Sequence, residues 1–344
     1  MKMTYRARRR LRSCLVGLGV VALLAVLAWG CWMLWLQRFV VYTPDGAVLN
    51  FQQDYRIDGG EPAVEPVQST VPIHYNEGED RVNNSTELTQ ITGYYATTSM
   101  LLDSVTDVRT SITALPKGTA VMLDLKSGFG NFYYSTDVVG ASVTDQIDTA
   151  MMDELIKTLA KSDYYLIARV PAFRDRAFGL ENTEYGLPTE GGYLWYDDDN
   201  CYWLDPTSSG TMFYLTSIAT ELRELGFDEV VFTEFRVPDT SEIVWRSDLS
   251  REDALAKAAK ELVDSCATNS FAVSFETGNS GFALPSGRSR LYLTGVEASQ
   301  AQSVLDAAQV PDKQTQLVFL TEAMDTRYDI TSVLRPLQVV STGE

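Results

Sequence analysis

The chain has 344 residues, of which 45% are hydrophobic, so it can bury a full core in one large domain or two small ones. It carries 46 acidic and 28 basic side chains, a formal net charge of −18. This excess of negative charge argues against nucleic acid and anionic membrane surfaces as partners, because both would be repelled.

The N-terminal residues predict a membrane anchor. Residues 14–36 contain no charged side chain, and a helix of that length rises about 35 Å, enough to cross a bilayer. The tail at residues 1–13 is basic, and by the positive-inside rule it stays in the cytoplasm. We therefore predict a single-pass signal anchor in the cell membrane, with the following domain extracytoplasmic. A cleaved signal peptide is the competing interpretation, but the apolar run is longer than a usual signal sequence.

Residues 37–88 are rich in Asp, Glu, Gln, Pro and Gly and show little periodicity, which is typical of a stalk or an irregular lead-in. From residue 89 onwards, apolar runs typical of strands alternate with segments of helical periodicity. Seven strands are predicted, at residues 91–96, 119–125, 164–170, 230–232, 271–275, 290–294 and 317–320. Helices are predicted between them at residues 101–108, 147–159, 215–225 and 250–263, and around residue 304.

This alternation favours a parallel α/β architecture, and the length of residues 89–344 fits a (β/α)8 TIM-barrel-like domain. The periodicity weakens after residue 275, so the barrel is expected to be irregular or incomplete in its C-terminal half. A long excursion at residues 171–206 interrupts the pattern. Loops of that length within a compact domain usually serve a function.

Carboxylates follow several of the predicted strands. Asp124, Glu234, Glu276 and Glu322 each fall where a predicted strand leaves the sheet. In a parallel barrel these strand ends meet at one rim, which carries the chemistry. Glycosidic cleavage needs a pair of carboxylates, one as acid and one as base or nucleophile, so convergence of two of these residues would form such a site.

Other site types find little support in the sequence. The only histidine is His74, in the predicted stalk, so a Ser-His-Asp triad or a typical zinc site is not expected. The glycines around residue 128 do not complete a dinucleotide fingerprint, and the acidic run at residues 197–200 lacks EF-hand spacing. We predict neither a cofactor nor a metal. Cys201 and Cys266 are open to two interpretations, a disulfide or two buried thiols.

Three segments, at residues 168–175, 203–206 and 226–238, together resemble a known family. They read ARVPAFRD, WLDP and GFDEVVFTEFRVP, and the strand at residues 121–126 ends in the D-x-K of Asp124 and Lys126. These segments are similar to those of the bacterial glycoside hydrolase-like domains of the DUF4015 type. The resemblance covers about residues 90–240 in order. It implies a TIM barrel and a carbohydrate substrate.

The sequence departs from that family at one position of the last segment. Where the family has FDYVRFP, this chain has Phe232 to Pro238 reading FTEFRVP, so Thr233 replaces the family aspartate. A threonine cannot serve as a carboxylate acid or nucleophile. Glu234 is its neighbour, but adjacent strand residues point to opposite faces.

Two functional hypotheses follow. The first is a membrane-anchored glycoside hydrolase acting on envelope or extracellular polysaccharide, with Glu234 as general acid and Glu276 or Asp124 as the second carboxylate. The second is an inactive barrel that binds glycan or an envelope protein. The expected substrate-binding residues are Arg169, Arg236, Lys126, Tyr133, Trp195, Trp203 and Glu322. Arg169 and Arg236 have an alternative structural interpretation, in which each neutralises a buried acid.

Overall fold

The structure is a computed structural model that describes residues 29, 40–43, 46–49 and 87–340. The chain divides into two compact units, Met1–Gly78 and Glu79–Glu344. In the first unit, β1 (Val40–Thr43) and β2 (Gly46–Leu49) form an antiparallel pair. All but one residue of the predicted anchor, and most of the predicted stalk, lie outside the described residues. Among the described residues, no helix has the length and apolar character needed to span a bilayer.

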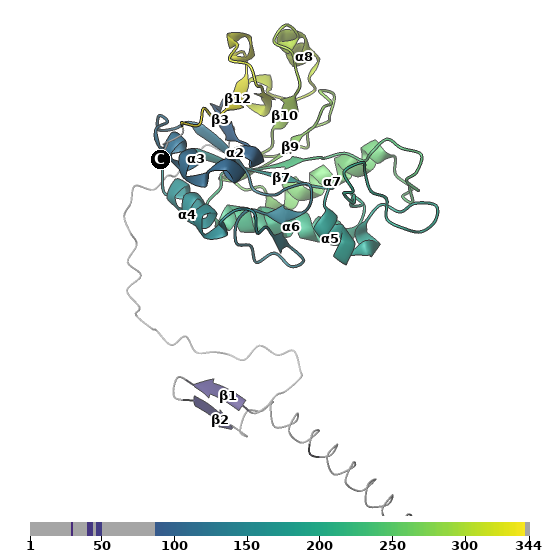
Figure 1. Cartoon of the computed structure of the whole chain (residues 1–344). Coiled ribbons are helices and arrows are strands. Elements are labelled where there is room, and N and C mark those ends of the chain that lie inside the picture. Colours follow the sequence, from purple (N-terminus) through teal and green to yellow (C-terminus); the bar gives the residue numbers. More distant parts are fainter. Residues whose placement is uncertain (1–28, 30–39, 44–45, 50–86, 341–344) are drawn as a thin grey trace, which may run out of the picture. The chain divides into compact units, whose positions relative to one another are not determined.

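Eight parallel strands of the second unit close into a barrel (Figure 1). They are β3 (Thr92–Ala96), β4 (Ala120–Asp124), β7 (Tyr165–Pro171), β8 (Glu229–Thr233), β9 (Ala272–Glu276), β10 (Leu291–Thr294), β11 (Leu317–Leu320) and β12 (Ser332–Pro336). Each strand pairs with the next one in this order, and β12 pairs with β3 to complete the circle. The predicted (β/α)8 architecture is confirmed. The seven predicted strands are the first seven of the barrel, and β12 is the one that was not predicted.

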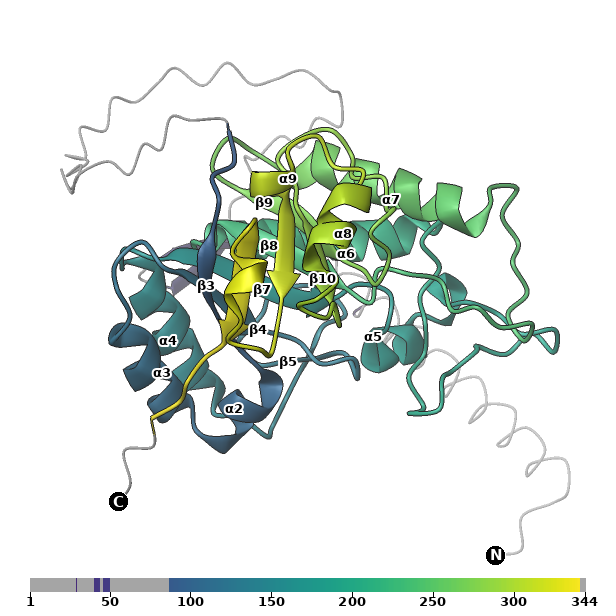
Figure 2. The same ribbon diagram turned by 90° about the horizontal axis from the view of Figure 1, so that it is seen from above.

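Helices cover the first half of the barrel more fully than the second (Figure 2). The first half carries α2 (Thr98–Asp103), α3 (Val105–Thr113), α4 (Thr149–Ala160), α5 (Arg176–Glu181), α6 (Ser209–Glu224) and α7 (Arg251–Cys266). The second half carries α8 (Ala301–Ala307) and α9 (Lys313–Gln316), which are shorter. In the described chain, β9 and β10 are joined without a helix, and β11 and β12 are linked by the 3-10 turn η3 (Thr326–Tyr328). The C-terminal half is therefore irregular, as expected, but the barrel is complete.

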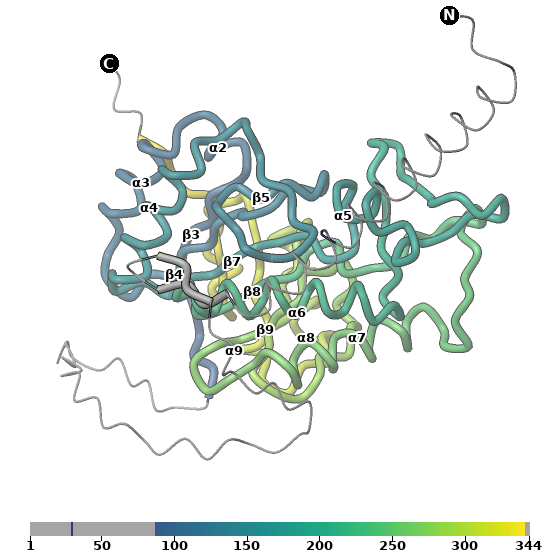
Figure 3. Tube along the Cα trace, turned by 90° about the horizontal axis from the view of Figure 1, so that it is seen from below, coloured from purple at the N-terminus to yellow at the C-terminus, as the bar shows by residue number. Residues whose placement is uncertain are grey.

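The helix ends explain why the chain turns where it does. Ser250 caps α7 by accepting a hydrogen bond from the backbone N–H of Asp253. Just after the C-terminal end of α6, Gly226 has φ +94°, a left-handed conformation that glycine adopts without strain. The chain then enters β8. Figure 3 shows α6 and α7 beside one another on the outside of the barrel.

The inside of the barrel is filled by alternate side chains of the strands. Its apolar middle includes Met122, Ile167, Val231 and Val318. The opposite faces of the first strands pack against the surrounding helices. Burial on both faces explains why the strands are continuous apolar runs, and every residue of β8 is buried.

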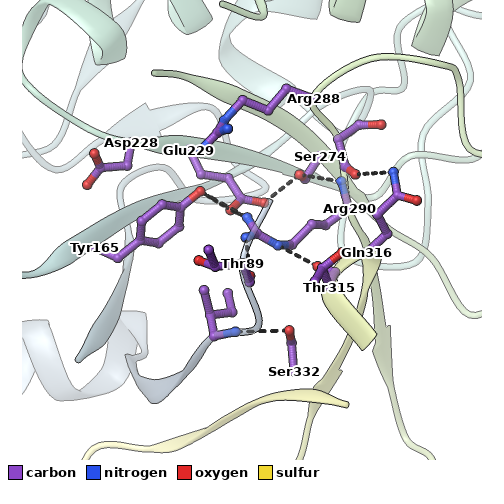
Figure 4. Close-up of polar contacts among 12 residues, drawn as sticks. Thr89, Tyr165, Asp228, Glu229, Ser274, Arg288, Arg290, Thr315, Gln316 and Ser332 are labelled. Carbon is purple, nitrogen blue, oxygen red and sulfur yellow. Dashed lines mark hydrogen bonds and ion pairs between the residues drawn. The ribbon is translucent and has the colours of Figure 1, made fainter. Parts of the chain in front are cut away.

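A buried ion pair closes the N-terminal end of the barrel (Figure 4). Glu229, at the start of β8, pairs with Arg290, and both side chains are 0% exposed. The Arg290 guanidinium also donates to the Tyr165 hydroxyl at 2.9 Å and to the carbonyl oxygens of Thr89 at 2.9 Å and Thr315 at 2.8 Å. One side chain thus joins β8 to the start of β7 and to the segments that precede β3 and β11.

The Glu229 carboxylate and the backbone of Arg290 have a further partner in common. The Ser274 hydroxyl, on β9, donates to the Glu229 carboxylate and accepts from the backbone N–H of Arg290 at 2.8 Å. Burial, and then the charge of Glu229, raises the pKa of the Tyr165 hydroxyl, so that group stays protonated. A buried charge pair is stabilising only when its other hydrogen-bonding groups are satisfied, and here every side-chain nitrogen and oxygen of Glu229 and Arg290 has a partner.

We expect Glu229→Gln to lower the free energy of unfolding by about 3–5 kcal/mol, because Arg290 would remain charged in the barrel without a counterion. The measurement is urea denaturation of the full chain and the variant under the same conditions. A matched control is Glu154→Gln, since Glu154 lies 4.0 Å from Lys157 on an exposed surface. The control should change stability by less than about 1 kcal/mol. Equal stability of Glu229→Gln and the control would mean that the pair does not hold the barrel closed.

Candidate active site at the barrel mouth

Two strand-end carboxylates share one arginine at the C-terminal mouth of the barrel. The Nη1 of Arg169, on β7, lies 3.0 Å from Oδ1 of Asp124 at the end of β4. Its Nε and Nη2 lie 2.7 and 2.9 Å from the two carboxylate oxygens of Glu276 at the end of β9. Asp124 and Glu276 therefore lie on different edges of one guanidinium. Their side chains are 14% and 11% exposed, and that of Arg169 is 28% exposed.

The charge of Arg169 is fixed by these neighbours. Burial alone would lower its pKa, but the hydrogen bonds and charges of Glu276 and Asp124 outweigh burial and raise it. Asp124 is itself held by a second group, because its Oδ2 accepts from the backbone N–H of Thr98 at 2.8 Å and from its hydroxyl at 3.2 Å. Thr98 begins α2, and nothing in its sequence pattern marked it for this role.

Thr233 and Glu234 lie between these carboxylates along the sheet. By alternation from the inward-facing Val231, Thr233 points into the mouth, where it lines the cavity walls. Glu234 follows it with φ +48°, a left-handed conformation that is uncommon for a residue other than glycine. Its carboxylate pairs with Nε of Arg236 at 3.1 Å and is 32% exposed. Such strain is often found at functional sites.

Three cavities meet at Arg169. The first has a volume of about 750 Å³ and includes Asp124, Thr233 and Tyr133 in its walls. The second, of about 550 Å³, is lined by Glu234, Glu276 and Arg236 among others. The third, of about 490 Å³, is lined by Glu322 and Tyr95. Two of the three predicted catalytic residues, Glu234 and Glu276, thus line one cavity, and Asp124 reaches it through Arg169.

Two predicted substrate-binding residues line these cavities, Tyr133 the first and Glu322 the third. Glu322 is exposed and lies near Tyr95, whose hydroxyl pKa is raised by burial and then by the Glu322 charge. Tyr133 is 3% exposed, and burial raises its pKa as well. Both belong to the mouth. Tyr95 was missed in the sequence, although its place near the end of β3 marks it as a rim residue.

Lys126 lines the first cavity, and its ammonium is engaged by groups of the protein itself. Its ammonium lies 2.7 Å from the Asp175 carboxylate, and both side chains are 0% exposed. The same ammonium donates to the Pro171 carbonyl at 3.0 Å, and the Asp175 carboxylate accepts from the Tyr214 hydroxyl at 3.0 Å. The lysine of the D-x-K segment therefore neutralises a buried aspartate and fixes the loop after β7.

The two tryptophans lie away from Arg169. Trp203 is 1% exposed, donates its Nε1 hydrogen to Asp197 at 3.0 Å, and packs under the Arg236 guanidinium at 4.6 Å. Trp195 donates to Glu242 at 2.8 Å and lines a separate cavity of about 460 Å³. The structure does not bring either indole to the mouth.

The described residues contain no cluster of three or more side chains suited to hold a metal. Cys201 and Cys266 are both buried and both free, so of the two interpretations the structure selects the thiols. Burial raises the pKa of the Cys201 thiol to about 11, and such a thiol is unreactive at neutral pH.

The fold resembles solved structures of low sequence identity. A hypothetical protein from Ruminiclostridium thermocellum is 20% identical with a TM-score of 0.45, over 53% of this chain and 96% of that one. An α-galactosidase from Lactobacillus brevis is 9% identical with a TM-score of 0.50, over 74% of this chain and 38% of that one. An exo-β-N-acetylglucosaminidase from Vibrio harveyi is 10% identical with a TM-score of 0.48, over 68% of this chain and 42% of that one. This chain spans about two fifths of the length of those two enzymes.

At such identities, the likeness to the Lactobacillus brevis enzyme concerns the barrel fold alone. No curated protein matches the sequence. The family model of DUF4015, described as "Putative glycosyl hydrolase domain", matches residues 91–271, more than half of the 344 residues. The same residues build β3 to β8, Asp124 and Arg169. The chain therefore belongs to the DUF4015 family of glycosyl hydrolase-like domains.

Proposed function

We propose that the chain is a glycoside hydrolase that cleaves its substrate at the barrel mouth, with Glu276 and Glu234 as the carboxylate pair. The observation that carries this proposal is that both side chains line one cavity of about 550 Å³, together with the Arg169 guanidinium. Cleavage of a glycosidic bond requires two carboxylates that flank it.

The surroundings of each carboxylate suggest its role. Glu276 receives two hydrogen bonds from Arg169, an environment that suits the base or nucleophile, which acts in its ionised form. The Glu234 side chain is more exposed than that of Glu276, and its direction is set by the left-handed backbone at that residue. This placement suits a proton donor at the edge of the cavity. Asp124 contacts the opposite edge of Arg169, so it positions the arginine rather than the substrate.

The proposed setting is the outer face of the cell membrane. It is supported by the uncharged run at residues 14–36 and the basic tail that precedes it. A domain held there would meet envelope or extracellular polysaccharide, which is the substrate class that we propose.

A second candidate is a barrel that binds glycan without cleaving it. Two observations favour it. Thr233 faces the mouth where the family sequence has an aspartate, and each acid is matched by an arginine: Glu234 by Arg236, and Glu276 by Arg169. In this candidate the same cavities hold the sugar, and no proton donor is available.

For the hydrolase, we expect Glu276→Gln and Glu234→Gln each to lower kcat by about 10²–10⁴-fold, the usual contribution of a positioned acid or base. The assay is release of reducing ends from envelope polysaccharide by the full chain. Glu261→Gln is the matched control, because Glu261 is exposed on α7 outside the cavities, and it should retain full activity. Retention of activity in both site variants would rule out this carboxylate pair.

For the non-catalytic barrel, the full chain should bind glycan and release no reducing ends. Thr233→Asp should then gain hydrolysis of at least about 100-fold over background, since it restores a carboxylate that faces the mouth. Thr233→Asn is the control of matched shape, and it should stay inactive. A wild-type protein that hydrolyses the polysaccharide without this change would exclude the second candidate.

A further inference from the structure

The cavity of about 750 Å³ has a polar floor and three exposed apolar side chains in its walls. The floor contains Arg169 and Asp124, which belong to the mouth. The rim contains Leu102, Phe129 and Leu180, which are 42%, 45% and 58% exposed, and the exposed polar residues Gln146 and Arg176. Single exposed apolar side chains are ordinary on a protein surface, but three that line one cavity indicate a surface that binds an apolar group.

These three side chains come from separate elements that meet around the cavity. Leu102 lies on α2, Phe129 in the turn between β4 and β5 (Asn131–Phe132), and Leu180 on α5 (Figure 2). The turn is fixed to α5, because the backbone N–H of Ala177 donates to the Phe129 carbonyl at 3.0 Å. Gly130 follows with φ +86°, and a Cβ there would lie 2.0 Å from the Asp175 carboxylate. The part of the rim formed by Phe129 and Leu180 is therefore held in place before any ligand binds.

The chemistry of the rim differs from that of a sugar platform. Sugars bind to hydrogen-bonding groups and to flat aromatic faces, and branched aliphatic side chains provide neither. Two of the three rim residues are leucines. The tyrosine in this cavity, Tyr133, is 3% exposed and presents little of its ring. An aliphatic chain gains free energy by covering such a rim, since burial removes apolar surface of both partners from water.

We propose that this cavity binds a glycolipid, with its sugar on the polar floor and its aliphatic chain across Leu102, Phe129 and Leu180. The inference rests on the proposed function in one respect, that a sugar binds at the mouth beside Arg169, which lines both this cavity and the one with Glu234 and Glu276. It goes further by assigning the group attached to that sugar. Within the proposed envelope glycans, the substrate class narrows to those whose sugar is joined to an aliphatic chain.

The test compares octyl and methyl glycosides of the same sugars, β-D-glucose, β-D-galactose and N-acetyl-β-D-glucosamine. Binding is measured by calorimetry with the full chain held in amphipol, with octyl glycosides below their micelle concentration. We expect the octyl glycoside to bind at least about tenfold more tightly than its methyl counterpart. The double variant Phe129→Ser/Leu180→Ser should reduce that preference at least fivefold and leave the methyl glycoside affinity within twofold of the wild-type value.

Val139→Ser is the matched control, because Val139 is 80% exposed and lines none of the three mouth cavities. It should keep the full octyl preference, which separates the rim from partitioning into the amphipol. Equal affinity of octyl and methyl glycosides, or a preference that the double variant retains, would overturn the glycolipid assignment and leave the proposed function intact. If no glycoside of either kind binds, the sugar site itself is wrong.

Discussion

The buried contact between Glu229 and Arg290 is the constraint on which the barrel depends. A closed barrel has no free edge, and at its N-terminal end a side chain that reaches several strands adds to the backbone pairing. Arg290 does so from inside, where its guanidinium bonds to Glu229, Tyr165 and two carbonyl oxygens of neighbouring segments. Solvent is excluded there, and the ionic groups serve the fold.

The opposite end of the same barrel contains the same chemistry in a different environment. Arg169 again binds acidic groups from other strands, here β4 and β9. The side chains of Arg169, Asp124 and Glu276 are 28%, 14% and 11% exposed, and three cavities open onto the arginine. Partial exposure leaves these groups accessible to a ligand, which can replace a hydrogen bond that the protein now makes to itself. The division between a sealed end and an open end agrees with the general placement of active sites in barrels of this kind.

Much of the fold was predictable because its strands are buried on both faces and read as continuous apolar runs. The strand β12 was missed because its apolar part is short, with the polar Ser332 at one end and Arg335 and Pro336 at the other. Ser332 is polar for a structural reason, since its hydroxyl accepts from the backbone N–H of Ile91 at 3.0 Å as the barrel closes. That contact joins residues 241 positions apart, so no local sequence pattern predicts it.

The site was predictable in its residues but not in its arrangement. Strand ends identify Asp124 and Glu276, whereas their sharing of Arg169 depends on the register between β4 and β7 and on the curvature that brings β9 across the mouth. The left-handed backbone conformation of Glu234 could not be predicted from the sequence either. It has a consequence for how the chain can change. Glycine at this position would relieve strain of about 1–3 kcal/mol and delete the carboxylate in one step. Stability of the fold and retention of the carboxylate are therefore opposed at residue 234. A lineage that no longer used the carboxylate would gain a more stable barrel by replacing Glu234 with glycine.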